Sequence, residues 1–141
     1  MELLISIIFI LSTAVGIQEE KEKWQRVYTG DDSIIEMNVS RVTFGDKKIG
    51  RVRFHTILSR PQTLKEIPGV KYKSRVETIE FKCIERQYRV YAATLLDVKG
   101  KPIQSYEVEV SEEWKSLKAG GMMEKLFRPA CKLIDDKRRN P

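Results

Sequence analysis

Three consecutive segments with alternating apolar and polar residues, joined by very short connections, constrain this fold more than any other feature. They run over Ser74–Cys83, Gln87–Val98 and Ile103–Val110. Glu85-Arg86 joins the first two, and Lys99–Pro102, with a glycine that can adopt positive φ, joins the last two. Strands joined by connections this short lie side by side and antiparallel. The sequence therefore predicts an antiparallel meander.

More strands are predicted before the meander, over Trp24–Tyr28, Ile34–Met37 and Arg51–Leu58. In the last of these, Val52, Phe54, Thr56 and Leu58 share one face, and Arg51, Arg53 and His55 share the other. The segment Gln87–Val98 is partly apolar on both faces, so we expect it to be a central strand. Strict alternation would place its residues Tyr88, Val90, Ala92, Thr94, Leu96 and Val98 together on one face.

The end of the chain changes its period. Met122, Met123, Leu126 and Phe127 recur at helical spacing. We expect a helix from about Gly121 to Leu133 that kinks at Pro129 or stops near Arg128, because proline removes a helical hydrogen bond. Residues 135–141 are expected to form a charged, frayed tail. The predicted fold class is α+β, with an antiparallel sheet of about six strands and one C-terminal helix.

The first residues read as a signal peptide rather than as part of the fold. Leu3–Leu11 is apolar, and Ala14-Val15-Gly16 has the small-x-small form of a signal-peptidase site. Residues 1–16 are therefore expected to be removed, leaving a domain over 17–134. The n-region has no Lys or Arg, so an uncleaved membrane anchor is the alternative, although the apolar stretch is short of the roughly 20 residues that span a bilayer. No other segment is apolar enough to span a membrane.

Two cysteines, Cys83 and Cys131, follow the predicted signal. In an exported chain an even pair favours a disulfide. Two buried free thiols are the alternative. Two distant cysteines and the single histidine, His55, do not make a zinc site, so we expect neither a metal nor another cofactor.

Positive charge is concentrated in one block. Between Arg41 and Arg75 there are ten basic and two acidic residues. The residues predicted to form a basic binding patch are Lys47, Lys48, Arg51, Arg53, Lys71, Lys73 and Arg75. Such a patch would attract acidic macromolecules. The alternative is an ordinary solvated face with counter-charges from Glu107 and Glu109.

The chain resembles the surface-adhesin protein E domain of Gram-negative bacteria. The residues that carry the resemblance are Trp24, the stretch Ile35–Val42, Glu77-Thr78-Ile79-Glu80-Phe81-Lys82-Cys83, Arg86-Gln87-Tyr88-Arg89, Gly100, Trp114, Gly120-Gly121, Leu126-Phe127 and Cys131. The resemblance implies a six-stranded antiparallel sheet with a C-terminal helix tied to one face by a Cys83–Cys131 disulfide. It also implies export. The name-giving member is a lipoprotein adhesin for host extracellular-matrix proteins, whereas this chain has no lipid-acceptor cysteine near the expected cleavage site.

These observations predict an exported, non-catalytic binding module, located in the periplasm or at the cell surface and not a lipoprotein. No catalytic motif accompanies His55, and Trp24 and Trp114 are expected in the core before any ligand role. The expected partner is a host extracellular-matrix protein or a sulfated or acidic polysaccharide, and not a nucleic acid. The alternative is a structural or assembly partner of an envelope protein, with homodimer formation as one form of it.

Overall fold

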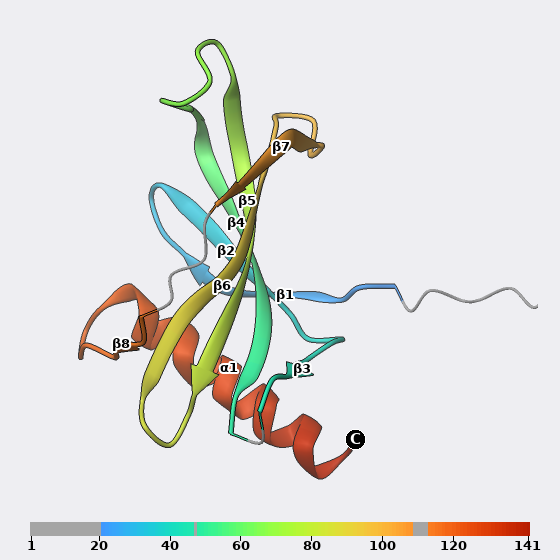
Figure 1. Ribbon diagram of the computed structural model, residues 1–141, viewed down its shortest axis with the longest axis vertical. Coiled ribbons are helices and arrows are strands. Elements are labelled where there is room, and N and C mark those ends of the chain that lie inside the picture. Colours follow the sequence, from blue (N-terminus) through green and yellow to red (C-terminus); the bar gives the residue numbers. More distant parts are fainter. Residues whose placement is uncertain (1–20, 47, 109–112) are drawn as a thin grey trace, which may run out of the picture.

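The computed structural model describes residues 21–46, 48–108 and 113–141, and shows a curled antiparallel sheet with one helix against it (Figure 1). The predicted signal peptide, residues 1–16, lies outside the described residues. The elements are β1 (Trp24–Thr29), β2 (Ser33–Asn38), β3 (Thr43–Phe44), β4 (Gly50–Thr63), β5 (Lys71–Lys82), β6 (Gln87–Leu96), β7 (Pro102–Val108), β8 (Lys115–Ser116) and α1 (Met122–Arg139).

Six strands form the main path of the sheet, in the order β1-β2-β4-β5-β6-β7, and all neighbours are antiparallel. This confirms the predicted fold class. Two short strands were not predicted: β3 pairs with β4, and β8 pairs with β6. The Lys99–Pro102 turn carries Gly100 at φ +80°, in the left-handed region that favours glycine.

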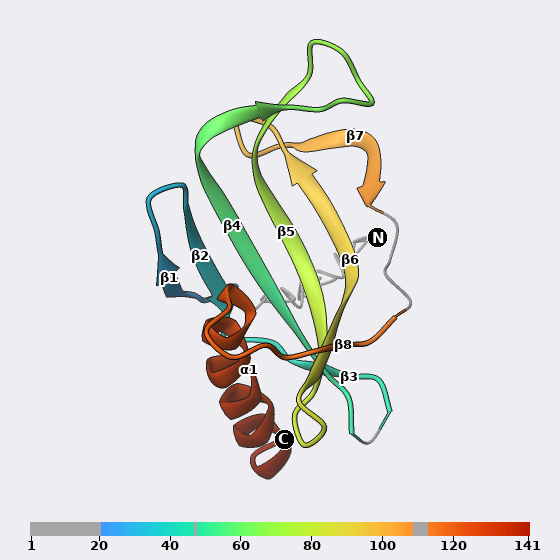
Figure 2. The same ribbon diagram turned by 90° about the vertical axis from the view of Figure 1, so that its left-hand side faces the viewer.

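Strand β4 follows the predicted alternation. Val52, Phe54, Thr56 and Leu58 are buried, whereas Arg51, Arg53 and His55 are half-buried on the other face. The β4–β5 hairpin extends well past the rest of the sheet (Figure 2). The register shifts between Ile57 and Gln62 of β4, where the strand leaves the body of the molecule.

Strict alternation along β6 was a wrong prediction. Thr78 pairs with Ala92 and Ile79 pairs with Val90, so Tyr91 is an extra residue in a β-bulge. A bulge reverses the faces of the residues that follow it. Before the bulge, Tyr88 and Val90 therefore lie on the helix side of the sheet. Beyond the bulge, the residues on that side are Ala93 and Leu95, and both are buried.

The prediction that the helix stops near Arg128 or Leu133 was also wrong. The helix α1 continues through Pro129 to Arg139, so most of the expected frayed tail is its last turns. Proline leaves one carbonyl of the preceding turn without its helical hydrogen bond. Packing offsets this cost, because Leu126 and Phe127 before the proline and Ala130 and Ile134 after it are all buried.

The core lies between α1 and one face of the sheet. Phe54, Phe81 and Phe127 form two edge-to-face ring contacts, with centroids 6.1 and 5.7 Å apart. Gly50 lets the helix approach closely, since a Cβ there would lie 2.5 Å from Ile134 Cδ1. The first residue of β4 thus marks the point where the sheet and the last third of α1 meet.

The disulfide predicted between Cys83 and Cys131 is present, with the Cα atoms 5.8 Å apart. It joins the residue after β5 to the middle of α1. In the chain-entropy account, a closed loop of this size stabilises the fold by about 4 kcal/mol. Among the described residues, no helix has the length and apolar character needed to cross a membrane.

Candidate binding face

The helix α1 packs against one face of the sheet (Figure 2). Among the described residues no helix lies on the other face, which we call the open face. The open face consists of three cross-strand rows on β4, β5 and β6. The rows are Arg51–Glu80–Arg89, Arg53–Thr78–Ala92 and His55–Val76–Thr94. Because paired residues of neighbouring strands project to the same side, each row presents its side chains together.

Glu80 is the centre of the first row and is only 1% exposed. Its two carboxylate oxygens accept hydrogen bonds from Arg51 Nε at 3.0 Å and from Arg89 Nε at 2.6 Å. A buried carboxylate requires such partners, because removing a charge from water is costly unless it is paired. The two arginines therefore hold the sheet together as well as contributing charge to the open face.

Cations and aromatic rings are stacked beside this row. The Arg51 guanidinium lies 4.1 Å from the centre of the Tyr91 ring. Tyr91 is the extra residue of the β6 bulge and is 39% exposed. Lys82 and Arg89 lie 4.2 and 4.4 Å from the Trp114 ring. Such contacts keep the cations in place while one side of each remains accessible.

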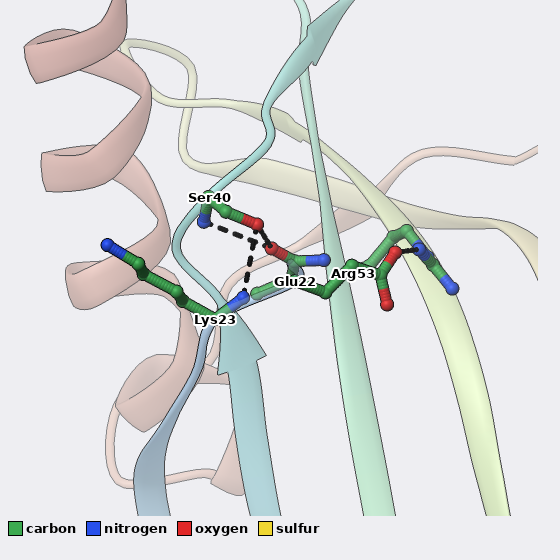
Figure 3. A network of polar contacts seen from close by, with 5 residues as sticks. Glu22, Lys23, Ser40 and Arg53 are labelled. Carbon is green, nitrogen blue, oxygen red and sulfur yellow. Dashed lines mark hydrogen bonds and ion pairs between the residues drawn. The ribbon is translucent and has the colours of Figure 1, made fainter. Parts of the chain in front are cut away.

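Arg53, in the second row, is more exposed than Arg51. It donates from Nη1 to Glu22 Oε1 (Figure 3). Its guanidinium lies 5.7 Å from the centre of the Trp24 ring. The two side chains of the ion pair are 37% and 44% exposed. Exposed pairs of this kind contribute only about 0–1 kcal/mol, so a ligand anion could replace Glu22 at little cost.

His55 lies at the end of the face nearest β2. Its ring contacts Trp24 with centroids 5.8 Å apart, and Nδ1 lies 4.0 Å from Glu36 Oε2. Burial lowers the pKa of His55 below 6.5, and the Glu36 carboxylate opposes that shift. Among the described residues, its Nε2 has no hydrogen-bond partner.

A hollow of about 230 Å³ opens between these rows and the start of β7. Small side chains form it, because Thr78, Ala92 and Thr94 stand where larger residues would fill the face. Its lining residues are Arg53, Val76, Thr78, Ala92, Ala93, Thr94, Leu96 and Pro102. An apolar floor with hydroxyls and one guanidinium suits a side chain or sugar ring that carries an acidic group.

The structure brings only two residues of the predicted basic patch together. Arg51 and Arg53 share the open face. Arg75 lies on the opposite face, since it pairs across the strands with the buried Thr56, and it binds Glu77 at 2.6 Å. Three more residues of the patch lie apart from these: Lys48 precedes β4, and Lys71 and Lys73 lie in the extended hairpin. Lys47 is outside the described residues.

Sequence reasoning missed the aromatic partners of these cations. Trp24 and Trp114 were expected in the core, but both are half-buried beside arginines and outside the main core cluster. The contact of Tyr91 with Arg51 was not predicted. Among the described residues, no group of three His, Cys, Asp or Glu could hold a metal ion.

Comparison with known proteins agrees with this architecture. The family described as "Surface-adhesin protein E" matches residues 24–132. The solved structure of Haemophilus influenzae protein E superposes with a TM-score of 0.56 over 79% of this chain and 92% of that chain. The two sequences are 9% identical, so this likeness shows the fold alone. No curated protein sequence matches the chain significantly.

Proposed function

The chain belongs to the surface-adhesin protein E family, and from this premise we propose that it is an exported, non-catalytic binding protein whose open face recognises an acidic macromolecule. The ligand classes that fit are a host extracellular-matrix protein and a sulfated or acidic polysaccharide. The observation that carries the proposal is the pairing of Arg51 with Tyr91 and of Arg53 with Trp24 on the open face.

The chemistry of these pairs supports an anionic ligand. A guanidinium presents parallel N–H donors that match the oxygens of a carboxylate or sulfate. The adjacent rings offer flat apolar surface at low entropic cost, which is a common property of binding hot spots. The hollow beside Arg53 could accept the apolar part of the same ligand.

The proposal is tested by binding of the exported chain, residues 17–141, to immobilised heparin, laminin and vitronectin across a salt series. The informative variant is Arg53→Glu, because this side chain can be changed without disturbing the buried Glu80 cluster. The matched control is Lys132→Glu, which makes the same charge change at an exposed lysine of α1, away from the open face.

We expect binding that weakens as salt rises, because exposed charges are screened over about 8–10 Å at physiological ionic strength. The open-face variant should bind at least about tenfold more weakly, and the control should bind almost as the wild type does. Equal losses of binding in both variants would show that binding depends on net charge and not on the open face. Absence of binding at low salt would remove the proposal.

A second function, assembly with an envelope protein or a second copy of this chain, is favoured by strand β1. Among the described residues β1 pairs only with β2, so its other edge has free backbone donors and acceptors. An edge strand can add a strand from another chain. A chain that sediments as a monomer over a wide concentration range and retains no envelope protein would exclude this role.

A further inference from the structure

A second hollow, whose lining shares no residue with the open-face rows, lies where the segment before β1 passes the last turns of α1. It has a volume of about 370 Å³ and is lined by Lys21, Lys23, Val39, Ser40 and Lys137. We call it the lysine hollow. Its three charged lining residues come from two segments that are far apart in sequence, and none of the lining residues is acidic.

The backbone around the hollow is fixed by a connected set of hydrogen bonds. Lys23 N donates to Ser40 Oγ at 3.3 Å, and Val39 N donates to Lys23 O at 2.9 Å. Ser40 donates to Asn38 Oδ1 from both Oγ and N, at 2.6 and 3.0 Å. Asn38 is fully buried at the end of β2. The backbone of this part of the lining is therefore fixed before any ligand arrives, which lowers the cost of binding.

Neighbouring charges are directed away from one another. Figure 3 shows the Glu22 carboxylate reaching Arg53, whereas the Lys23 ammonium extends toward α1. The acidic residue next to Lys23 in sequence is thus engaged on the other side of the strand. Within the described part of the chain, Lys21, Lys23 and Lys137 form no ion pair.

The end of the helix does not cancel this positive charge. A helix C-terminus carries roughly half a negative charge. The last turn of α1 contains three cations, Lys137, Arg138 and Arg139. Their charge exceeds the combined negative charge of the helix end and of Asp135 and Asp136, which precede them. With Lys21 and Lys23 opposite, the field inside the hollow favours an anion.

We propose that the lysine hollow binds a phosphate group. Lysine ammonium groups serve as point charges for phosphate, and their long stems let several of them converge on one compact anion. The hollow is larger than a phosphate ion, so it can also accept a phosphate that is attached to a larger headgroup. The phosphate could come from a phospholipid or from solution, and the experiment separates these sources.

The exported chain is titrated with inorganic phosphate while the backbone amide NMR shifts of Lys23, Val39 and Ser40 are followed. In parallel it is floated with vesicles of phosphatidylcholine, alone or mixed with phosphatidylglycerol. The test variant is Lys21→Gln with Lys23→Gln and Lys137→Gln. The control, with the same loss of charge at exposed positions away from the hollow, is Lys115→Gln with Lys118→Gln and Lys132→Gln.

We expect phosphate, phosphatidylglycerol vesicles or both to bind the wild type, with affinity at least about tenfold lower in the test variant and nearly unchanged in the control. Binding of phosphate alone assigns a soluble ligand, and binding of vesicles alone assigns a lipid headgroup. No binding of either probe at low salt, or equal losses in both variants, overturns the proposal. The test variant leaves Arg51, Arg53 and Tyr91 unchanged and should keep the heparin binding of the open face, so failure here and failure of the proposed function are distinguishable.

Discussion

At the scale of single residues, Glu80 differs most from what its sequence context indicates. It lies between the core residues Ile79 and Phe81 and alternates with them, as an exposed strand residue would. Nothing in that pattern shows that Arg51 and Arg89 enclose it, because cross-strand partners depend on register. Sequence reasoning identified the faces of β4 correctly, but it placed Arg75 of β5 in one patch with Arg51 and Arg53. It also could not distinguish a structural arginine from a ligand-binding one.

Replacing Glu80 with alanine should leave two partly buried guanidinium groups without their carboxylate. Loss of one partner of a fully buried pair costs about 3–5 kcal/mol. Both arginine side chains are 26% exposed, so we expect a smaller loss of about 2 kcal/mol in urea unfolding. The control is Glu77→Ala, which removes the partner of Arg75. Because Glu77 is 19% exposed and Glu80 only 1%, this change should cost less than about 1 kcal/mol. Equal costs would show that the Glu80 cluster has no special structural role.

His55 should make the stability depend on pH. Burial lowers its pKa in the folded state, so below pH 6.5 the unfolded chain binds more protons than the folded chain. Stability is therefore full above pH 6.5 and falls as the pH drops toward the folded-state pKa, by at most about 1.4 kcal/mol per pH unit. Unfolding free energies measured above about pH 5, where carboxylates remain ionised, should show this slope in the wild type and lose it in His55→Gln. An unchanged slope in the variant would assign it to other groups.

At the scale of elements, strand order and helix position followed from the sequence, whereas the irregularities did not. The bulge at Tyr91 lies in the apolar run Val90–Ala93, where no alternation of apolar and polar residues is present to mark the extra residue. The strands β3 and β8 have two residues each and no pattern of their own. The helix continues past Pro129 because tertiary packing of Ala130 and Ile134 outweighs local propensity.

The contact between β4 and α1 should be sensitive to one added methyl group. In Gly50→Ala the new Cβ would lie 2.5 to 2.8 Å from three carbon atoms of the buried Ile134 side chain. Overpacking of this kind costs about 1–3 kcal/mol. Combining the change with Ile134→Ala should remove part of that cost, so a double-mutant cycle should show coupling. Additive energies in the cycle would contradict the predicted clash.

At the scale of the whole molecule, the disulfide joins the two layers. Cys83→Ser with Cys131→Ser should lower the free energy of unfolding by about 4 kcal/mol, because the reduced chain regains loop entropy in the unfolded state. Hydrogen exchange of α1 amides should then become faster relative to those of β4 and β5. Unchanged exchange in α1 would mean that Leu126, Phe127 and Ile134 hold the helix without the covalent bond.

The distribution of basic residues along the sequence differs from their distribution over the folded molecule. The basic residues between Arg41 and Arg75 are contiguous in sequence, but alternation sends Arg53 and Arg75 to opposite faces and the hairpin carries Lys71 and Lys73 away from both. The candidate site was therefore predicted only in part. Its arginines on β4 were identified, and the aromatic residues beside them were not.

The most direct test of the open face is to map amide and arginine side-chain NMR shifts of the exported chain as a heparin oligosaccharide is added. The largest changes should fall on Arg51, Arg53, Thr78 and Tyr91, and α1 should be little affected. Changes confined to the β4–β5 hairpin or to α1, or no changes at low salt, would contradict the assignment of ligand binding to the open face.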